Sequence, residues 1–169
     1  GALDLENAAN AWTGGLNING GTVRVVAENR FGGSSQDITF DGGTLHATAP
    51  GDRTFAPNSA TLNAGGGTIL NNGMTLTWQT ALTGTGSLTK DGTGTLLLDV
   101  ANGANTYTGG TFITGGGTIS VVSEGKLPTG GDITLDNGTL KLDVAGARTF
   151  SNRGATTLAA GGGAMEVIS

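Results

Sequence analysis

His46 is the only histidine of the chain, so any catalytic site with an imidazole base depends on it. A Ser-His-Asp or Cys-His arrangement needs that base to be held by a positioned partner, and the sequence around His46 indicates none. An internal repeat described below places Lys141 at the matching position. We interpret His46 as a solvated residue beside a strand, and we predict that the chain is not an enzyme and has no catalytic residues.

Asp37 and Asp41 are a second candidate, because polysaccharide-acting enzymes on β-helices use clustered carboxylates. The same pair recurs in the internal repeat as Asp132 and Asp136. Aspartate favours turns and strand ends, and this preference explains more simply a pair that is duplicated together with its scaffold. We expect structural roles for all four residues, while a polysaccharide-acting enzyme stays open as an alternative.

Metal and phosphate sites have signatures that this sequence lacks. There is no Gly-Gly-x-Gly-x-Asp nonapeptide for calcium, and Asp52 and Asp91 are isolated acids. Gly84-Thr85-Gly86 and Gly92-Thr93-Gly94 are like phosphate loops only in their glycines, since neither has the Gly-Lys-Ser/Thr ending or a following helix. The chain has no cysteine, which excludes thiolate ligands and disulfides. We predict no metal site and no cofactor.

Aromatic and threonine side chains are the remaining candidates for binding. Trp12, Trp78 and Tyr107 could stack on sugars. Trp78 shares the alternation of an apolar strand face, so we expect it in the core, whereas Trp12 and Tyr107 both precede Thr-Gly-Gly and are expected to cover a corner of the chain path. Thr75 and Thr77 could face a repetitive surface such as ice, but one short row does not support a binding site. The sequence therefore leaves the ligand-binding residues unknown.

Composition excludes two classes of partner. Eight basic residues against 13 acidic ones, with a net charge of -5, provide no basic stripe for a nucleic-acid backbone. No apolar run reaches the roughly 20 residues that span a bilayer, so we expect no direct membrane insertion by this segment. Only 12% of the residues are charged and 36% are hydrophobic, which predicts a folded chain.

The sequence contains an internal repeat whose two copies are offset by about 95 residues. We interpret the chain as a single segment, residues 1–169, built from a duplicated unit of approximately residues 2–70 and 97–169, linked by 71–96. The pairs of matching segments are Leu3-Asp4-Leu5 with Leu98-Asp99-Val100, Trp12-Thr13-Gly14-Gly15 with Tyr107-Thr108-Gly109-Gly110, and Arg53-Thr54-Phe55 with Arg148-Thr149-Phe150.

A shorter cycle lies within the long unit. Glycine pairs or triplets at Gly20, Gly42 and Gly66 recur at a period of roughly 20–24 residues, each followed by Thr and a few alternating apolar residues. Alternation predicts strands, and the frequent glycines and β-branched threonines disfavour helices. An antiparallel sandwich would give no reason for a unit to restart partway through its own sequence. We therefore predict an all-β parallel solenoid, a fragment of a longer rod because both ends lie inside a repeat.

The most specific stretch resembles the passenger-associated strand repeat of bacterial autotransporters. It reads Leu-Thr-Gly-Thr-Gly-Ser-Leu-Thr-Lys-Asp-Gly-Thr-Gly-Thr-Leu-Leu-Leu over residues 82–98, then Asn-Thr-Tyr-Thr-Gly-Gly-Thr over 105–111 and Gly-Gly-Thr-Ile over 116–119. A truncated second copy runs from Ala2 to about Val26. It carries Trp12 where the pattern has Tyr.

The resemblance implies a right-handed parallel β-helix in the secreted passenger of a type V system. Such a passenger is exported to the cell surface and is continuous with a C-terminal outer-membrane β-barrel. Passengers of this kind act as adhesins, proteases, esterases or toxins. We expect a structural stalk segment that displays an adhesive or other functional region. As an alternative, the flank of the β-helix is itself an adhesin for a host surface, a glycan or a sister passenger.

Overall fold

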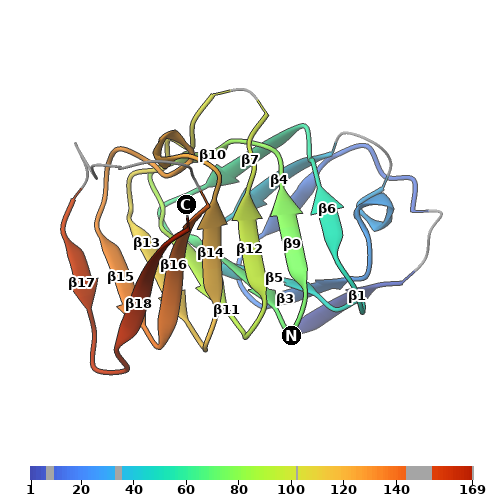
Figure 1. The fold of residues 1–169 in the computed structure, drawn as a ribbon. Helices are drawn as coiled ribbons and strands as arrows, with labels where there is room; N and C mark the ends of the chain where they lie inside the picture. The colour runs from blue at the N-terminus through green and yellow to red at the C-terminus, as the bar shows by residue number, and fades with distance from the viewer. Residues whose placement is uncertain (7–9, 33–35, 102, 144–153, 169) are drawn as a thin grey trace.

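The computed structural model describes residues 1–6, 10–32, 36–101, 103–143 and 154–168. The chain is an all-β parallel solenoid of about 7 turns, which confirms the predicted fold class. Successive turns stack side by side along the axis from β1 (Ala2–Leu5) to β17 (Thr156–Leu158) (Figure 1). The described residues contain no α-helix, only two single-turn 3₁₀ helices, η1 (Glu28–Arg30) and η2 (Glu124–Lys126).

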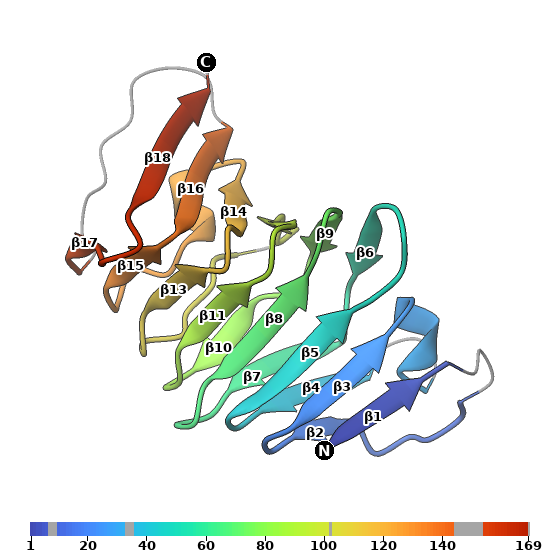
Figure 2. The same cartoon turned by 90° about the horizontal axis from the view of Figure 1, so that it is seen from below.

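Three parallel sheets form the faces of the solenoid. The first face has eight strands in the order β1, β3 (Thr22–Val25), β5 (Gly43–Ala47), β8 (Gly67–Asn71), β11 (Leu88–Asp91), β13 (Thr111–Thr114), β15 (Ile133–Asp136) and β17. Figure 2 shows these strands next to one another. The second face has four strands, β2 (Leu16–Ile18), β4 (Asp37–Phe40), β7 (Ser59–Leu62) and β10 (Leu82–Gly84). The third face has six, β6 (Arg53–Phe55), β9 (Thr75–Trp78), β12 (Thr95–Leu98), β14 (Thr118–Val121), β16 (Gly138–Asp143) and β18 (Gly163–Ile168).

Alternation along each strand sends every second side chain into the axis. Because all pairs are parallel and in register, the inward residues of successive turns stack into ladders. One ladder of the third face runs Phe55, Trp78, Leu98, Val121 and Leu142, all fully buried. Trp78 is 0% exposed and packs edge-to-face on Phe55, with ring centroids 6.4 Å apart. The prediction that Trp78 lies in the core is confirmed.

Glycine at the corners allows the backbones of neighbouring turns to approach closely. A Cβ atom on Gly86 would lie 1.8 Å from the carbonyl oxygen of Asn63 in the preceding turn. No side chain fits there, because the obstacle is backbone. The glycine-rich turns between the strands of the sequence therefore reflect close stacking of neighbouring turns, as at this corner.

The matching segments of the repeat do not lie on the same face. β3 is on the first face, and its counterpart β14 is on the third. Likewise β4 is on the second face and its counterpart β15 is on the first. Residues that correspond in sequence therefore point in different directions around the axis. The domain interpretation itself stays a prediction, and its segment Arg148-Thr149-Phe150 lies outside the described residues.

One pairing of the sequence comparison is wrong in its register. Leu3 pairs with Val23 across the first face, and Leu96 pairs with Ile119 across the third face. Ile119 is the counterpart of Val23 in the repeat. The structural counterpart of Leu3 is therefore Leu96, not Leu98. The error arose because the connection from β1 to Trp12 is shorter than the one from β12 to Tyr107.

Candidate functional sites

The four aspartates considered as catalytic candidates all bond to a neighbouring turn. Asp41 accepts a hydrogen bond from the backbone N–H of Gly65 at 2.8 Å, and Asp136 accepts one from Gly161 at 2.7 Å. The Asp132 carboxylate accepts from the N–H of Ala155, also at 2.7 Å. Each of the three carboxylates thus ties its turn to the next one at the end of a strand.

Asp37 also ties its turn to the next one, but through hydrogen bonds from side chains. Its Oδ1 accepts hydrogen bonds from Asn58 Nδ2 and Ser59 Oγ, both at 2.7 Å, and these two bonds lower the pKa of Asp37. Asp37 begins β4, and Asp41 follows the end of that strand. Four residues of extended strand separate them by about 13 Å, which is more than the roughly 5–10 Å that joins paired catalytic carboxylates. The structure does not bring them together as an acid–base pair.

His46 lies within β5. The sequence analysis instead placed it beside a strand. Its neighbours across the first face are Arg24 on β3 and Leu70 on β8. Partial burial lowers the pKa of His46, and the positive charge of Arg24 lowers it further. The described residues contain no group of three or more His, Cys, Asp or Glu that could hold a metal ion.

The corner formed by residues 105–110 holds two buried side chains with polar partners. Asn105, 1% exposed, accepts a hydrogen bond from the N–H of Leu82 at 2.8 Å and donates one to the carbonyl of Lys126 in η2. Tyr107 is fully buried, and its hydroxyl bonds to Thr111 Oγ1 at 2.7 Å. The sequence analysis expected Tyr107 to cover the corner from outside. Its side chain is instead buried within the corner.

The counterpart of this corner near the N-terminus is built in the same way but is more open. Asn10 Nδ2 donates to the carbonyl of Arg30 in η1 at 2.9 Å, as Asn105 does to η2. Trp12 packs against the core yet is only half-buried, whereas its counterpart Tyr107 is fully buried. The sequence comparison paired the two aromatics and included the asparagines in the motif, but it assigned neither asparagine a structural role.

Lys90 is a buried cation that sequence reasoning missed. It occupies an inward position of the first face between Ile69 and Ile113, and it is 0% exposed. Its ammonium donates to the carbonyl of Gly92 at 2.7 Å and to that of Asp91. Burial lowers the pKa of Lys90 to about 8, partly opposed by the Asp91 carboxylate. Its contacts are with corner backbone in the core, so they are structural.

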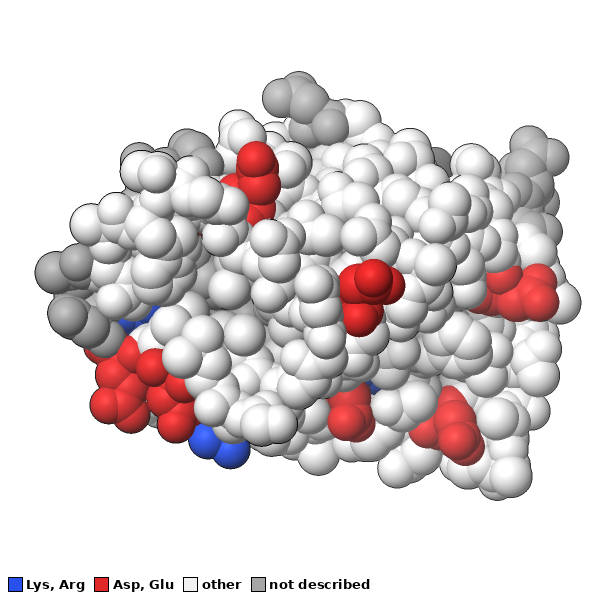
Figure 3. All heavy atoms as spheres, turned by 180° about the vertical axis from the view of Figure 1, so that it is seen from behind, with Lys and Arg blue, Asp and Glu red and all other residues white. Residues whose placement is uncertain are grey.

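Threonine rows run along the axis, across strands and not along them. On the first face the outward residues in register are Thr22, Thr44, Thr68, Thr89, Phe112, Thr134 and Thr157. On the third face Thr75 is in register with Thr95, Thr118 and Thr139. The rows are therefore longer than the sequence analysis allowed for. Figure 3 shows a flank where scattered acidic side chains form no extended charged patch.

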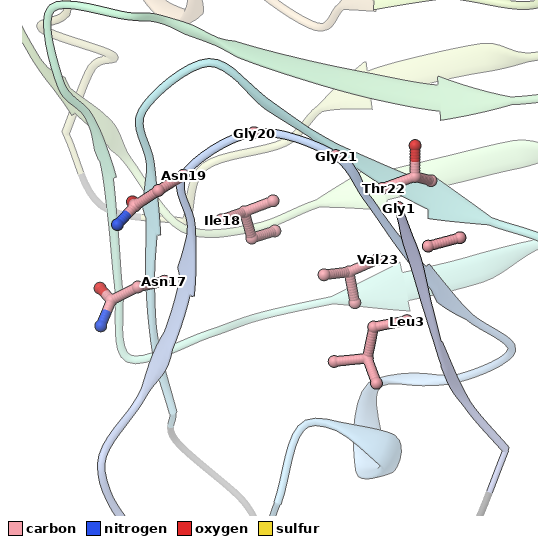
Figure 4. Close-up of a pocket in the computed structure, with 10 residues that line it drawn as sticks. Gly1, Leu3, Asn17, Ile18, Asn19, Gly20, Gly21, Thr22 and Val23 are labelled. Atoms are coloured by element: carbon pink, nitrogen blue, oxygen red, sulfur yellow. The ribbon is translucent and has the colours of Figure 1, made fainter.

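Two hollows open at the N-terminal end. One, of about 480 Å³, is lined by β1, β2 and the turn between β2 and β3, and the side chains of Leu3, Ile18 and Val23 point into it (Figure 4). The other, of about 270 Å³, is lined by Leu3, Trp12, Gly14, Gly15 and Leu16. Both lie where the ladders end.

Comparison with known protein families finds a match for two segments of this solenoid. Residues 1–25 and 88–121 match the passenger-associated-transport-repeat family. These two segments are passenger-associated repeats, as the sequence pattern predicted. No helix among the described residues is long and apolar enough to cross a membrane.

A particular relative extends the likeness beyond the two repeats. The chain is 39% identical over 156 residues to the BmaC autotransporter adhesin of Brucella suis biovar 1 (strain 1330), an alignment that covers 86% of this chain. The chain is a distant homologue of that adhesin and spans 4% of its length. This homology implies a surface or secreted location. No solved structure matches the chain.

Proposed function

We propose that the chain is a structural stalk segment of an autotransporter passenger, one that displays an adhesive region at the bacterial surface. The observation that carries this proposal is the continuous register of the first face, which runs through eight strands from β1 to β17. Each turn covers the apolar face of the next, so the segment acts as a stiff spacer whose length grows with every turn. Homology to an adhesin supports adhesion as the role of the whole passenger.

A second candidate is that the flank itself is the adhesin. The aligned threonine row of the first face supports it, together with Phe112, which interrupts the row and is 39% exposed. A flat row of hydroxyls with one exposed ring suits a glycan better than a charged ligand, because rings stack on sugars. Threonine also suits exposed strand positions for its β-propensity alone, and for this reason the stalk remains the first proposal.

Competition with the purified chain separates the two candidates. Bacteria that display the full passenger would be allowed to adhere to host cells in the presence of a large excess of the soluble 169-residue chain. If the chain is a stalk, adhesion is unchanged. If the flank is the adhesin, the soluble chain blocks adhesion, and a Phe112→Ser variant blocks it less well.

The described geometry offers no support for a polysaccharide-acting enzyme. Asp37 and Asp41 lie at opposite ends of one strand and are engaged by the neighbouring turn. Homology to an adhesin passenger agrees with a non-enzymatic role.

A further inference from the structure

A polar hollow of about 370 Å³ opens at the corner where the third face of the solenoid passes into the second. This corner joins β6 to β7 in one turn and β9 to β10 in the next, and β9 and β12 run towards it in Figure 1. The lining comes from three successive turns, residues 58–60, 79–83 and 100–101. A volume of this size is within the usual range of small-ligand sites.

Two threonine hydroxyls in the lining donate their protons to the fold. Thr80 Oγ1 donates to the carbonyl of Pro57 in the preceding turn. Thr83 Oγ1 donates to the carbonyl of Ala60 at 3.3 Å, again in the preceding turn. A hydroxyl has one proton and two lone pairs, so both oxygens remain able to accept hydrogen bonds from a ligand.

Asn58 and Ser59 are oriented in a similar way by Asp37. Asn58 Nδ2 and Ser59 Oγ both donate to Asp37 Oδ1 at 2.7 Å. The Ser59 proton is therefore used, and its oxygen and Asn58 Oδ1 remain as acceptors. Together with the two threonines, these residues give the hollow a set of acceptors whose directions the fold determines.

Gln79 adds hydrogen-bond donors to this set. Its side chain is exposed, lines the hollow and makes no hydrogen bond with any residue that the structure describes. Gln36 is different because both ends of its amide are used inside the fold. Gln36 Oε1 accepts from the N–H of Gly15 at 3.1 Å, and Nε2 donates to the carbonyl of Gly32 at 3.4 Å. The free carboxamide of Gln79 offers two N–H donors to a ligand.

None of the described residues that line the hollow is charged. Two charged groups adjoin it, and both are engaged. Asp37 accepts from the lining side chains, and the Lys126 ammonium donates to the carbonyl of Val100. Ala81 and Ala101 add apolar surface to the wall. The hollow therefore suits a neutral ligand, because an ionic ligand would lose its hydration without gaining a charged partner.

We propose that this hollow binds a neutral sugar unit, whose hydroxyl groups donate to Ser59, Thr80 and Thr83 and accept from Gln79 Nε2. A sugar hydroxyl is both donor and acceptor, and the C–H groups of the ring provide an apolar face for the alanines. A peptide fits less well, because each carbonyl that it brings would meet hydroxyl oxygens whose protons are already used. The hollow is remote from the threonine row of the first face, so this inference depends on neither candidate function.

Nuclear magnetic resonance of the chain labelled with ¹⁵N-glutamine tests the proposal. Gln36 and Gln79 are the two glutamines, so Gln36 is an internal control. The probes are glucose, galactose and N-acetylglucosamine, each as the free sugar and as the methyl glycoside, with N-acetylneuraminic acid as the charged comparison. We expect at least one neutral probe to shift the side-chain signal of Gln79, with a dissociation constant on the order of millimolar, while Gln36 stays unchanged.

The forms of the probes distinguish two sources of the sugar. A shift with the methyl glycoside assigns a unit linked within a glycan, whereas a shift with the free sugar alone assigns a soluble sugar. The proposal is overturned if no neutral probe moves the Gln79 signal. It is also overturned if N-acetylneuraminic acid moves this signal equally, since the hollow then does not select a neutral ligand.

Variants assign the binding to this hollow, with saturation transfer to the protons of the bound probe as the readout. Gln79→Ala should leave the thermal midpoint unchanged and raise the dissociation constant about fivefold, because it removes one ligand hydrogen bond and none within the described fold. Thr83→Val should also weaken binding. Asn17→Ala, which removes an exposed carboxamide on β2, should bind as the unaltered chain does.

A contrary pattern in the variants would overturn the assignment. Binding that Gln79→Ala spares and Phe112→Ser abolishes would place the sugar on the threonine row of the first face. Failure of sugar binding would leave the stalk proposal standing, because that proposal is tested by the adhesion of bacteria and not by occupancy of this hollow.

Discussion

Asn105→Ala is the substitution that tests the buried polar corner most sharply. The Asn105 side chain is 1% exposed, accepts from the N–H of Leu82 and donates to the carbonyl of Lys126. Alanine removes both partners without adding any. One strand amide at a buried position and one 3₁₀-helix carbonyl at a partly buried position lose this hydrogen bond.

The structure sets the expected magnitude. Each unsatisfied buried polar group costs about 1–3 kcal/mol, and the Lys126 carbonyl lies in the less buried part of the site, so we expect Asn105→Ala to lower the free energy of unfolding by about 2–4 kcal/mol. Asn10→Ala is the matched control. Asn10 is half-buried, and within the described part of the chain its side chain donates to the carbonyl of Arg30, so the expected loss is about 1 kcal/mol.

Urea unfolding followed by far-UV circular dichroism measures both losses. The difference between the two variants is the informative quantity, because the two asparagines occupy equivalent positions in the two repeats. A loss for Asn105→Ala within about 0.5 kcal/mol of the wild type, the range of ordinary surface substitutions, would refute the reasoning.

Two further predictions concern the core. Trp78→Ala should lower the free energy of unfolding by about 3–5 kcal/mol in the same urea titration, because it empties a fully buried ladder position beside Phe55. An effect below about 1 kcal/mol would contradict the stacking described above. Burial lowers the pKa of Lys90 from 10.5 to about 8, so the folded state binds this proton less tightly than the unfolded chain does, and stability should rise as the pH increases through that interval. Measured as unfolding free energy at pH 7 and pH 10, this rise should be absent in Lys90→Met; an equal rise in both proteins would count against the assignment.

The strands and their inward faces could be predicted from the sequence because alternation is a local signal. Trp78 shares the parity of its apolar neighbours, and the structure places it in the core. The passenger-associated pattern was equally local, since it lies within one stretch of chain. Each of these features depends on residues only a few positions apart.

The features that sequence reasoning missed depend on residues about one turn apart. Lys90 lies in a ladder between Ile69 and Ile113, which belong to the turns before and after it. Thr75 joins a row only through the register with Thr95. The face on which a repeat falls depends on the lengths of all the corners before it, and the shift of one face between β3 and β14 was therefore not evident.

Replacement of the segment within the displayed passenger tests the central proposal most directly. The 169 residues would be exchanged for an unrelated parallel β-solenoid of the same number of turns, with an epitope tag at the tip to verify display. Adhesion to host cells would then be counted. A stalk predicts that adhesion is retained at the wild-type level whenever the tag is displayed. Loss of adhesion with the tag fully displayed would contradict the stalk and assign binding to the flank of this segment.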